Sequence, residues 1–303
     1  MAVYVNTNVS SLQGQRNLNN VNNSLNTTYQ RLSTGLRINS AKDDSAGLQI
    51  ADRMTSQING LNQGNRNSND GIALAQTIES GMDEISSMLQ KIRTLAVQAN
   101  NGTNTLEDRQ ALAKEASSLS SEVTRIAEQT KFGGKTVLKG GGSIGTIYGA
   151  NGGTKATGRI TFQVGANQGD MISLDVSNFT MSQIIARAGA ANASVSAGGA
   201  FSFDTAGTAA TGVGSVISAL DKMIADVDSQ RASLGSIQNR LESSVRNQSN
   251  VAANQSDARS RIRDADFAEE SANLTQQNII QQAATSMLMQ ANSRPQLGLS
   301  LIG

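Results

Sequence analysis

Two compact clusters of charged residues bring carboxylates close together in the sequence. They are Lys42-Asp43-Asp44 and the run Arg261-Ile-Arg-Asp-Ala-Asp266. Paired carboxylates can serve acid–base catalysis or bind a hard cation such as Ca²⁺. A calcium loop needs oxygen ligands at alternating positions and a bidentate acid, and the chain has no such run. We therefore interpret both clusters as charges at helix ends and as salt bridges between helices, close to breaks in those helices.

Other routes to catalysis need residue types that the sequence lacks. There is no His and no Cys, which removes the usual zinc, copper and haem ligands as well as Ser-His-Asp and Cys-His nucleophile systems. The glycine runs Gly133-Gly134 and Gly140-Gly-Gly142 do not belong to a GxGxxG or GxxxxGK[ST] motif that follows a strand. We therefore expect no enzyme activity, no catalytic or metal-binding residue and no cofactor.

Charge and hydropathy argue against two further classes of partner. The 25 basic and 24 acidic residues give a formal net charge of +1, so no bulk field attracts nucleic acid or an anionic membrane. Aromatic residues make up only 3% of the chain, which excludes a stacking platform for single-stranded nucleic acid. No apolar run approaches the roughly 18–20 residues that a membrane helix needs.

Glycine content divides the chain into two flanks and a middle. Sixteen of the 29 glycines lie between Gly140 and Gly214. The flanks, 1–139 and 215–303, are rich in Asn, Gln, Ser and Ala and show the periodicity of helices. The middle contains two alternating runs, Arg159–Val164 and Met171–Val176, which predict a hairpin. Phe179 to Ala188 predicts a short helix, and Phe201–Phe203 indicates a further strand.

Heptad spacing marks the buried face of each flanking helix, because apolar residues recur at steps of four and three. In the N-terminal flank such a series ends before Asn101-Gly102, a natural helix stop. We predict that two series form the core of a rod: Ile78, Met82, Ile85, Leu89 and Ile92 in the first flank, and Leu220, Met223, Val227, Leu234, Ile237 and Leu241 in the second. A further series runs from Leu112 to Ile126.

Shorter series lie at the two chain ends. They consist of Leu18, Val21, Leu25 and Leu32 near the N-terminus and of Ile280, Ala284, Met287 and Ala291 near the C-terminus. A helix with one apolar stripe is marginal alone in water and needs a partner. We therefore expect a mainly α fold: an elongated helical coiled-coil bundle formed by the N- and C-terminal flanks, with a small α+β inserted domain.

Several long strings of residues resemble those of bacterial flagellins. In the first flank they are Leu32-Ser-Thr-Gly-Leu-Arg-Ile-Asn-Ser-Ala-Lys-Asp-Asp-Ser-Ala-Gly47 and Leu89-Gln-Lys-Ile-Arg-Thr-Leu-Ala-Val-Gln-Ala-Asn100. Phe162-Gln-Val-Gly-Ala-Asn167 is similar to a motif at the start of flagellin insertions. The second flank adds Leu234-Gly-Ser-Ile-Gln-Asn-Arg-Leu241 and Arg263-Asp-Ala-Asp-Phe267. The resemblance covers the chain except much of 140–158 and 189–212.

The resemblance implies a structural subunit that polymerises into the flagellar filament and gives swimming motility. It implies a terminal coiled-coil domain (1–40 and 260–303) in the filament core, a rod-like helical bundle (41–139 and 215–259) and a small surface-exposed domain (140–214). The terminal series named above would then be the subunit interface. Family members are exported unfolded through the flagellar type III apparatus and assemble at the filament tip, where their end helices fold. The start of the chain lacks the pattern of an ordinary signal peptide, which agrees with such export.

The resemblance also implies partners. They are an export chaperone, a filament cap and the flagellin-sensing Toll-like receptor. The strip that matches the receptor site contains Gln90, Lys91, Leu95 and Glu115. The family's usual Arg is replaced here by Lys91, which lacks a planar bidentate donor.

Three alternatives compete with a filament subunit. A hook–filament junction protein shares related end helices but forms only short zones. A coiled-coil scaffold or signalling protein would explain the heptads, although not the terminal motifs or the Gly-rich insertion. A flagellin with a metallopeptidase insertion needs a His-based zinc motif, which this sequence cannot provide.

Overall fold

The protein is mainly helical, as the periodicity predicts. A computed structural model describes residues 7–140, 146–148, 157–189, 195–196, 198–203 and 209–299. The chain separates into two compact units, of which unit 1 comprises 1–58 and 252–303 and unit 2 comprises 59–251. The boundary falls inside two long helices, α2 (Ser45–Ala99) and α5 (Ala209–Arg263). Each unit thus combines segments from both flanks of the chain.

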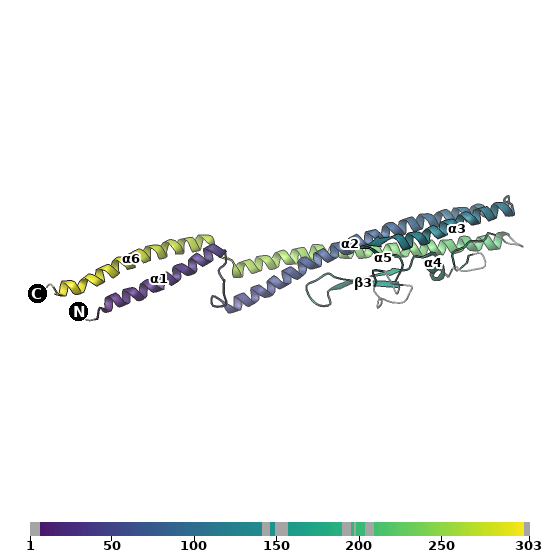
Figure 1. Cartoon of the computed structure of the whole chain (residues 1–303). Coiled ribbons are helices and arrows are strands. Elements are labelled where there is room, and N and C mark those ends of the chain that lie inside the picture. The colour runs from purple at the N-terminus through teal and green to yellow at the C-terminus, as the bar shows by residue number, and fades with distance from the viewer. Residues whose placement is uncertain are drawn as a thin grey trace. The chain divides into compact units, whose positions relative to one another are not determined.

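Unit 1 is built around a pair of helices from opposite ends of the chain. Helix α1 (Val9–Thr34) lies alongside α6 (Phe267–Leu299) (Figure 1). Helix α1 begins at Asn8, whose side chain accepts a hydrogen bond from the Ser11 amide, and ends at Gly35. Gly35 has φ of +71°, the left-handed conformation in which glycine often terminates helices.

Two breaks in the helices of unit 1 are hydrogen-bonded to each other. One break follows α1, and the other separates α5 from α6. The Arg37 amide donates to the Arg263 carbonyl at 2.7 Å, and the Ala265 amide donates to the Gly35 carbonyl at 3.0 Å. Leu36 and Asp264 form an antiparallel bridge at this point. These bonds fix where α1 and α6 start to run together, so they set the register of the pair.

Unit 2 contains the remaining parts of α2 and α5 together with α3 (Leu106–Gln129). Helix α2 ends at Ala99, with one residue between it and Asn101-Gly102, so the predicted helix stop is confirmed. Helix α3 begins with a capping box in which Thr105 and Asp108 bond each other's backbone amides. Polar contacts join α2 and α5: Arg93 pairs with Asp221 at 2.6 Å, and Gln238 donates to Glu79 at 2.9 Å.

Two small antiparallel sheets form, one at the end of the first flank and one in the middle segment. Strands β1 (Lys131–Phe132) and β2 (Lys135–Thr136) form a tight hairpin, and β3 (Thr157–Gln163) pairs with β4 (Met171–Ser177). The second pair confirms the predicted hairpin. The short helix α4 (Met181–Arg187) follows, also as predicted. Phe201 forms only an isolated bridge with Val195, so the expected strand at 201–203 is wrong as a strand.

The middle segment and the helices of unit 2 share one core. Leu174, Phe179 and Ile184 are fully buried in the same apolar cluster as residues of α2 and α5. The alternating burial of β4 explains this, because every second side chain points toward the helices. In the part of the chain that the structure describes, no helix is both long and apolar enough to span a membrane.

Candidate interaction surface on the terminal helices

The two charge clusters act as helix caps. Asp44 Oδ1 accepts from the Gly47 amide at 2.9 Å in the first turn of α2, and Asp266 Oδ1 accepts from the Ala268 amide at 2.8 Å at the start of α6. The pKa of Asp43 is below its ordinary value because the backbone amide of Ser40, followed by that of Asn39, donates to its carboxylate. The interpretation as helix-end charges is thus confirmed. Among the described residues, no group of three or more His, Cys, Asp or Glu could hold a metal ion.

The contact between α1 and α6 is narrow and partly polar. On α1 it follows the predicted series, with Leu25 only 5% exposed and Leu18, Val21 and Leu32 half-buried. On α6 the residues turned away from solvent recur at steps of four and three: Glu270, Leu274, Gln277, Gln281, Ala284, Leu288 and Ala291. Three of these seven are Glu or Gln and two are Ala, so this seam (the inner seam of α6) buries little apolar area.

Hydrogen bonds supplement the weak apolar contact. Gln281 Nε2 donates to Asn22 Oδ1 at 2.8 Å, and Asn8 Nδ2 donates to the Ala291 carbonyl at 2.7 Å. An ion pair joins Arg31 Nη1 to Glu270 Oε1 at 2.9 Å, with the Glu270 side chain 7% exposed. The sequence analysis missed this pair, because a search for apolar heptads skips charged residues at seam positions.

Four large apolar side chains on α6 are exposed to solvent. We call them the outer stripe: Ile279 (61% exposed), Ile280 (39%), Met287 (72%) and Met289 (67%). Helix α1 adds the exposed side chains of Val9, Leu12 and Tyr29. Within the predicted interface set, Ala284 and Ala291 therefore lie in the inner seam, whereas Ile280 and Met287 lie in the outer stripe.

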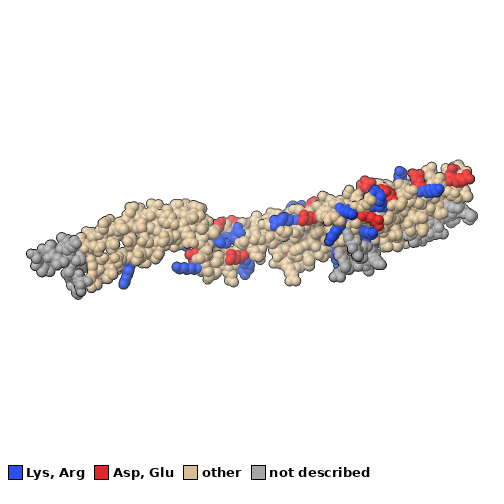
Figure 2. Space-filling view, in the orientation of Figure 1, with Lys and Arg blue, Asp and Glu red and all other residues tan. Residues whose placement is uncertain are grey.

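Charges are scarce on this pair of helices. Helix α1 carries only Arg16 and Arg31, and α6 carries Glu269, Glu270 and Arg294. On the face drawn in Figure 2, most blue and red side chains lie outside α1 and α6. A surface with exposed Ile and Met and few charges is typical of a protein–protein contact, because few charged groups lose their water when such a surface is covered.

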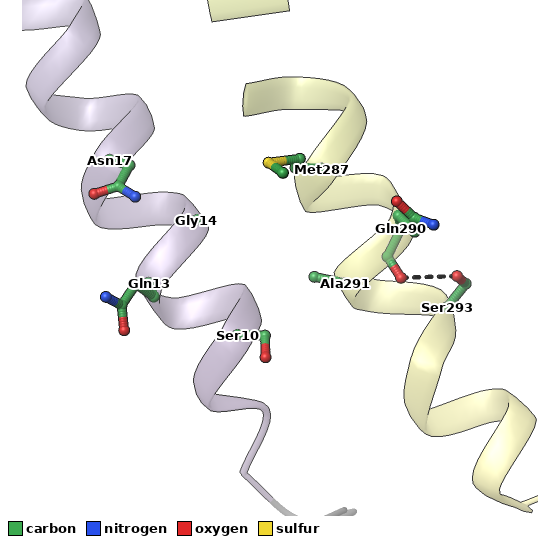
Figure 3. A pocket seen from close by; sticks show the side chains of 8 residues that line it. All are labelled: Ser10, Gln13, Gly14, Asn17, Met287, Gln290, Ala291 and Ser293. Atoms are coloured by element: carbon green, nitrogen blue, oxygen red, sulfur yellow. Dashed lines mark hydrogen bonds between the residues drawn. The ribbon is translucent and has the colours of Figure 1, made fainter. Parts of the chain in front are cut away.

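A groove of about 820 Å³ opens between α1 and α6. Figure 3 shows Met287 and Ala291 projecting from α6 on the side of α1, across from Gly14. Leu288 fills the space beside Gly14, since a Cβ added there would lie 3.0 Å from Leu288 Cδ1. The groove is lined by Ser10, Gln13, Gly14, Asn17, Met287, Gln290, Ala291 and Ser293. It is a concave apolar and amide surface without a titratable group, so it offers a docking site and no acid–base chemistry.

The residues predicted for the rod core all lie inside unit 2. Those with 0% exposure are Ile78, Met82, Ile85, Leu89, Ile92, Leu220, Met223, Val227 and Leu241, while Leu234 (3%) and Ile237 (7%) are nearly buried. Their steps of three, four and, from Val227 to Leu234, seven residues place them on one face of α2 and one face of α5.

The four residues assigned to receptor recognition differ in accessibility. Gln90 and Lys91 on α2 and Glu115 on α3 are exposed. Leu95 is buried in the apolar cluster of unit 2, with 8% exposure. Any contact with another protein at this strip would therefore rest on the three polar side chains in the structure described here.

Comparison with known proteins identifies relatives over the whole chain. Family profiles for the bacterial flagellin N-terminal helical region and the bacterial flagellin C-terminal helical region match residues 5–142 and 217–302. Polar flagellin C of Vibrio parahaemolyticus is 36% identical, and Flagellin A of Vibrio cholerae is 37% identical, each over 100% of both chains. A solved structure described as a flagellar hook-associated protein from Vibrio parahaemolyticus is similar in fold, with a TM-score of 0.55, 16% identity and coverage of 73% of this chain and 100% of that one.

Proposed function

The chain belongs to the bacterial flagellin family and is a structural subunit of the flagellar filament, and on this premise we propose that α1 and α6 carry the surface through which subunits polymerise. As a flagellin it is a non-enzyme of the extracellular filament that serves motility. Its partner in the filament is further copies of itself.

The observation that carries the proposal is the division of apolar residues on α6. The inner seam, which faces α1 of the same chain, contains Glu270, Gln277 and Gln281. The outer stripe, which faces solvent, contains Ile279, Ile280, Met287 and Met289. Burial of an Ile or Met side chain contributes about 1.5–3 kcal/mol, so most of the apolar free energy of this helix is released only when another chain covers it.

The same division supports folding of the ends on assembly. An isolated pair of helices with a polar seam buries too little apolar surface to offset the entropy of ordering its backbone. Contact with neighbouring chains supplies the missing burial. Such contacts are heterologous and do not close, which generates a helical filament. The terminal helices of the free chain are therefore poorly ordered, and those of the filament are helical.

The proposed division into three domains follows from the helix breaks. The breaks after Gly35 and at 264–266 lie near the boundaries at 40 and 260, which separate the terminal coiled coil (1–40 and 260–303) from the rod (41–139 and 215–259). The middle segment, 140–214, is the third domain in this division. Its buried side chains join the core of the rod, so we propose that it is anchored there by β4 and α4.

The outer stripe also supports the proposed roles of an export chaperone and a filament cap. A chain that carries uncovered Ile and Met side chains is prone to premature association. An export chaperone that covers α6 before secretion, and a cap that retains unfolded chains at the filament tip, would both prevent it. The absence of Cys supports export as an unfolded chain, because no disulfide has to be undone.

Assembly through the outer stripe is tested with a double substitution, Ile279→Ser and Ile280→Ser. Ile and Ser have similar helix propensities, so the change removes apolar surface without penalising the helix. We expect the critical concentration for assembly to rise at least roughly tenfold, because two Ile side chains no longer become buried. Negative-stain electron microscopy and sedimentation measure it, with Val97→Ser, an exposed Val on α2, as the matched control. Assembly of the double variant at the wild-type concentration would contradict the proposal.

We also propose that the Toll-like receptor contacts the strip on α2 and α3 through Gln90, Lys91 and Glu115, which are exposed. Because Leu95 is buried, a substitution there would disturb the fold as well as any contact. The informative variant is therefore Lys91→Ala, compared with Lys114→Ala on the exposed surface of α3. Signalling by folded monomer should fall only for the first, and equal signalling by both would exclude Lys91 as a contact.

A further inference from the structure

Among the described residues, the outer stripe contains two of the three most exposed methionines, Met287 and Met289. The sequence has no Cys and no Trp, and it has nine Met. Met82, Met181 and Met223 are at most 1% exposed, and Met54 and Met88 are half-buried. Only three of the described methionines are more than half exposed: Met171 (54%), Met287 (72%) and Met289 (67%). A dilute oxidant therefore meets these three thioethers first.

Two of the three flank the contact between α1 and α6. Leu288 packs beside Gly14 of α1, and its neighbours Met287 and Met289 project to either side of that contact. Met287 also lines the groove between the helices (Figure 3). Met171 instead lies at the start of β4 in unit 2. Among the described methionines, two exposed thioethers thus lie on the proposed assembly surface and one lies away from it.

We propose that Met287 and Met289 are oxidation sites, and that conversion of their thioethers to sulfoxides blocks subunit assembly reversibly. This inference rests on the proposed role of α6 in polymerisation. A peroxide supplies the oxygen atom: a sulfur lone pair attacks one peroxide oxygen, the O–O bond breaks, and the departing hydroxide takes the proton of the sulfur-bound hydroxyl, which leaves the sulfoxide and water. The thioether is oxidised by two electrons to the sulfoxide, and the peroxide is reduced by two.

The sulfoxide opposes assembly because of its polarity. It is a strong hydrogen-bond acceptor on a side chain that was apolar, so its burial between chains requires loss of bound water. Reduction of the sulfoxide by a thiol-dependent methionine sulfoxide reductase regenerates the thioether and the assembly surface.

The first experiment oxidises the full-length chain with hydrogen peroxide before and after assembly. Peptide mass spectrometry should find Met171, Met287 and Met289 oxidised in the free chain, and only Met171 oxidised in filaments. Seeded growth of the oxidised chain should be at least tenfold slower than that of untreated chain. Treatment with the two methionine sulfoxide reductases and a dithiol should restore it. Oxidised chain that elongates at the untreated rate, or Met287 and Met289 that react equally in filaments, would overturn the inference.

Variants assign the effect to the two residues. The double variant Met287→Leu and Met289→Leu keeps the apolar volume and cannot form a sulfoxide, so its growth should change less than twofold after peroxide. The control Met171→Leu should remain as sensitive as the wild type. If the double variant grows poorly even without peroxide, the test is whether reductase treatment restores the growth of oxidised wild-type chain. Failure to restore it overturns the inference. Untreated chain that forms no filaments refutes the proposed function itself, whereas filaments insensitive to peroxide refute only this inference.

Discussion

Glu270 places a carboxylate in the seam between α1 and α6 with one partner, the guanidinium of Arg31. Its second oxygen, Oε2, and the Arg31 Nε are both buried, and neither has a hydrogen-bond partner among the described residues. An incompletely satisfied ion pair adds little net stability, but a mismatched register would leave the buried Glu270 carboxylate without its partner. The ion pair therefore serves to align α1 with α6, and the hydrogen bonds between the adjacent helix breaks favour the same register.

Glycines in the middle of α2 have a comparable positioning role. The hairpin loop after β3 approaches α2 so closely that a Cβ at Gly64 would overlap the Val164 carbonyl. Asn67 Nδ2, one turn further along, donates to the Gln163 carbonyl at 2.9 Å. The sequence contained a signal for this contact, because Gly60, Gly64 and Gly71 lie inside a long helix although glycine is a weak helix former. The heptad search did not use it, because glycine contributes nothing to an apolar series.

A pair of glycine substitutions tests this close approach. Gly64→Ala should destabilise unit 2 by about 2 kcal/mol, since overpacking against rigid backbone costs roughly 1–3 kcal/mol. Gly235→Ala, in α5, should stabilise the chain by about 0.5–1 kcal/mol, because a Cβ there meets open space and Ala favours the helix. Urea unfolding followed by circular dichroism measures both. A gain of stability in both variants would show that the hairpin does not lie against Gly64.

Among the elements, α2 and α5 were the most predictable and α6 the least. The buried faces of α2 and α5 follow the heptads from Ile78 and from Leu220, because most of their large apolar residues face one core. On α6 large apolar residues lie both in the seam and on the solvent side. The predicted series therefore mixes Ile280 and Met287 of the outer stripe with Ala284 and Ala291 of the inner seam. Sequence periodicity identifies apolar residues, but it does not show whether they are buried within their own chain or by a neighbouring chain. The assignment of Ile280 and Met287 to the subunit interface remains a prediction.

The capping box of α3 predicts a pH dependence. Hydrogen bonds from the side chain and then the backbone of Thr105 lower the pKa of Asp108 in the folded chain. A depressed folded pKa adds stability that is present above the unfolded pKa of about 3.9 and is lost as the pH falls through the folded pKa. Asp108→Asn should therefore destabilise unit 2 at pH 7 and have little effect near pH 2.

The control for this prediction lies in the same helical turn. Glu107→Gln removes a neighbouring negative charge of the first turn but leaves the box between Thr105 and Asp108 intact. Thermal unfolding of both variants and the wild type at the two pH values separates loss of the box from loss of charge near the helix N-terminus. An Asp108→Asn penalty that persists unchanged at low pH would exclude the ionised carboxylate as its source.

For the whole molecule, the two units divide the work between stability and assembly. Unit 2 contains the large continuous core, to which the middle segment contributes Leu174, Phe179 and Ile184. Unit 1 contains a narrow seam and exposes Ile and Met side chains. The flank periodicity allowed the mainly helical fold to be predicted. The sharing of one core between the insertion and the rod was not apparent, because alternating strands show that one face is buried without showing against what.

Deletion of residues 264–303 tests this division, because the cut at the break after α5 removes α6 and leaves unit 2 complete. We expect the cooperative thermal transition of unit 2 to shift by less than about 4 °C, since less than about 1 kcal/mol of its stability depends on the tail. The same variant should form no filaments, because α1 loses its partner and the outer stripe is gone. A second variant, Leu174→Ala, has the reverse defect: it keeps unit 1 intact and creates a cavity in unit 2, which costs about 2–5 kcal/mol. Circular dichroism and seeded growth of both variants distinguish the two roles, and filaments from the tail-less chain would place the assembly surface in unit 2.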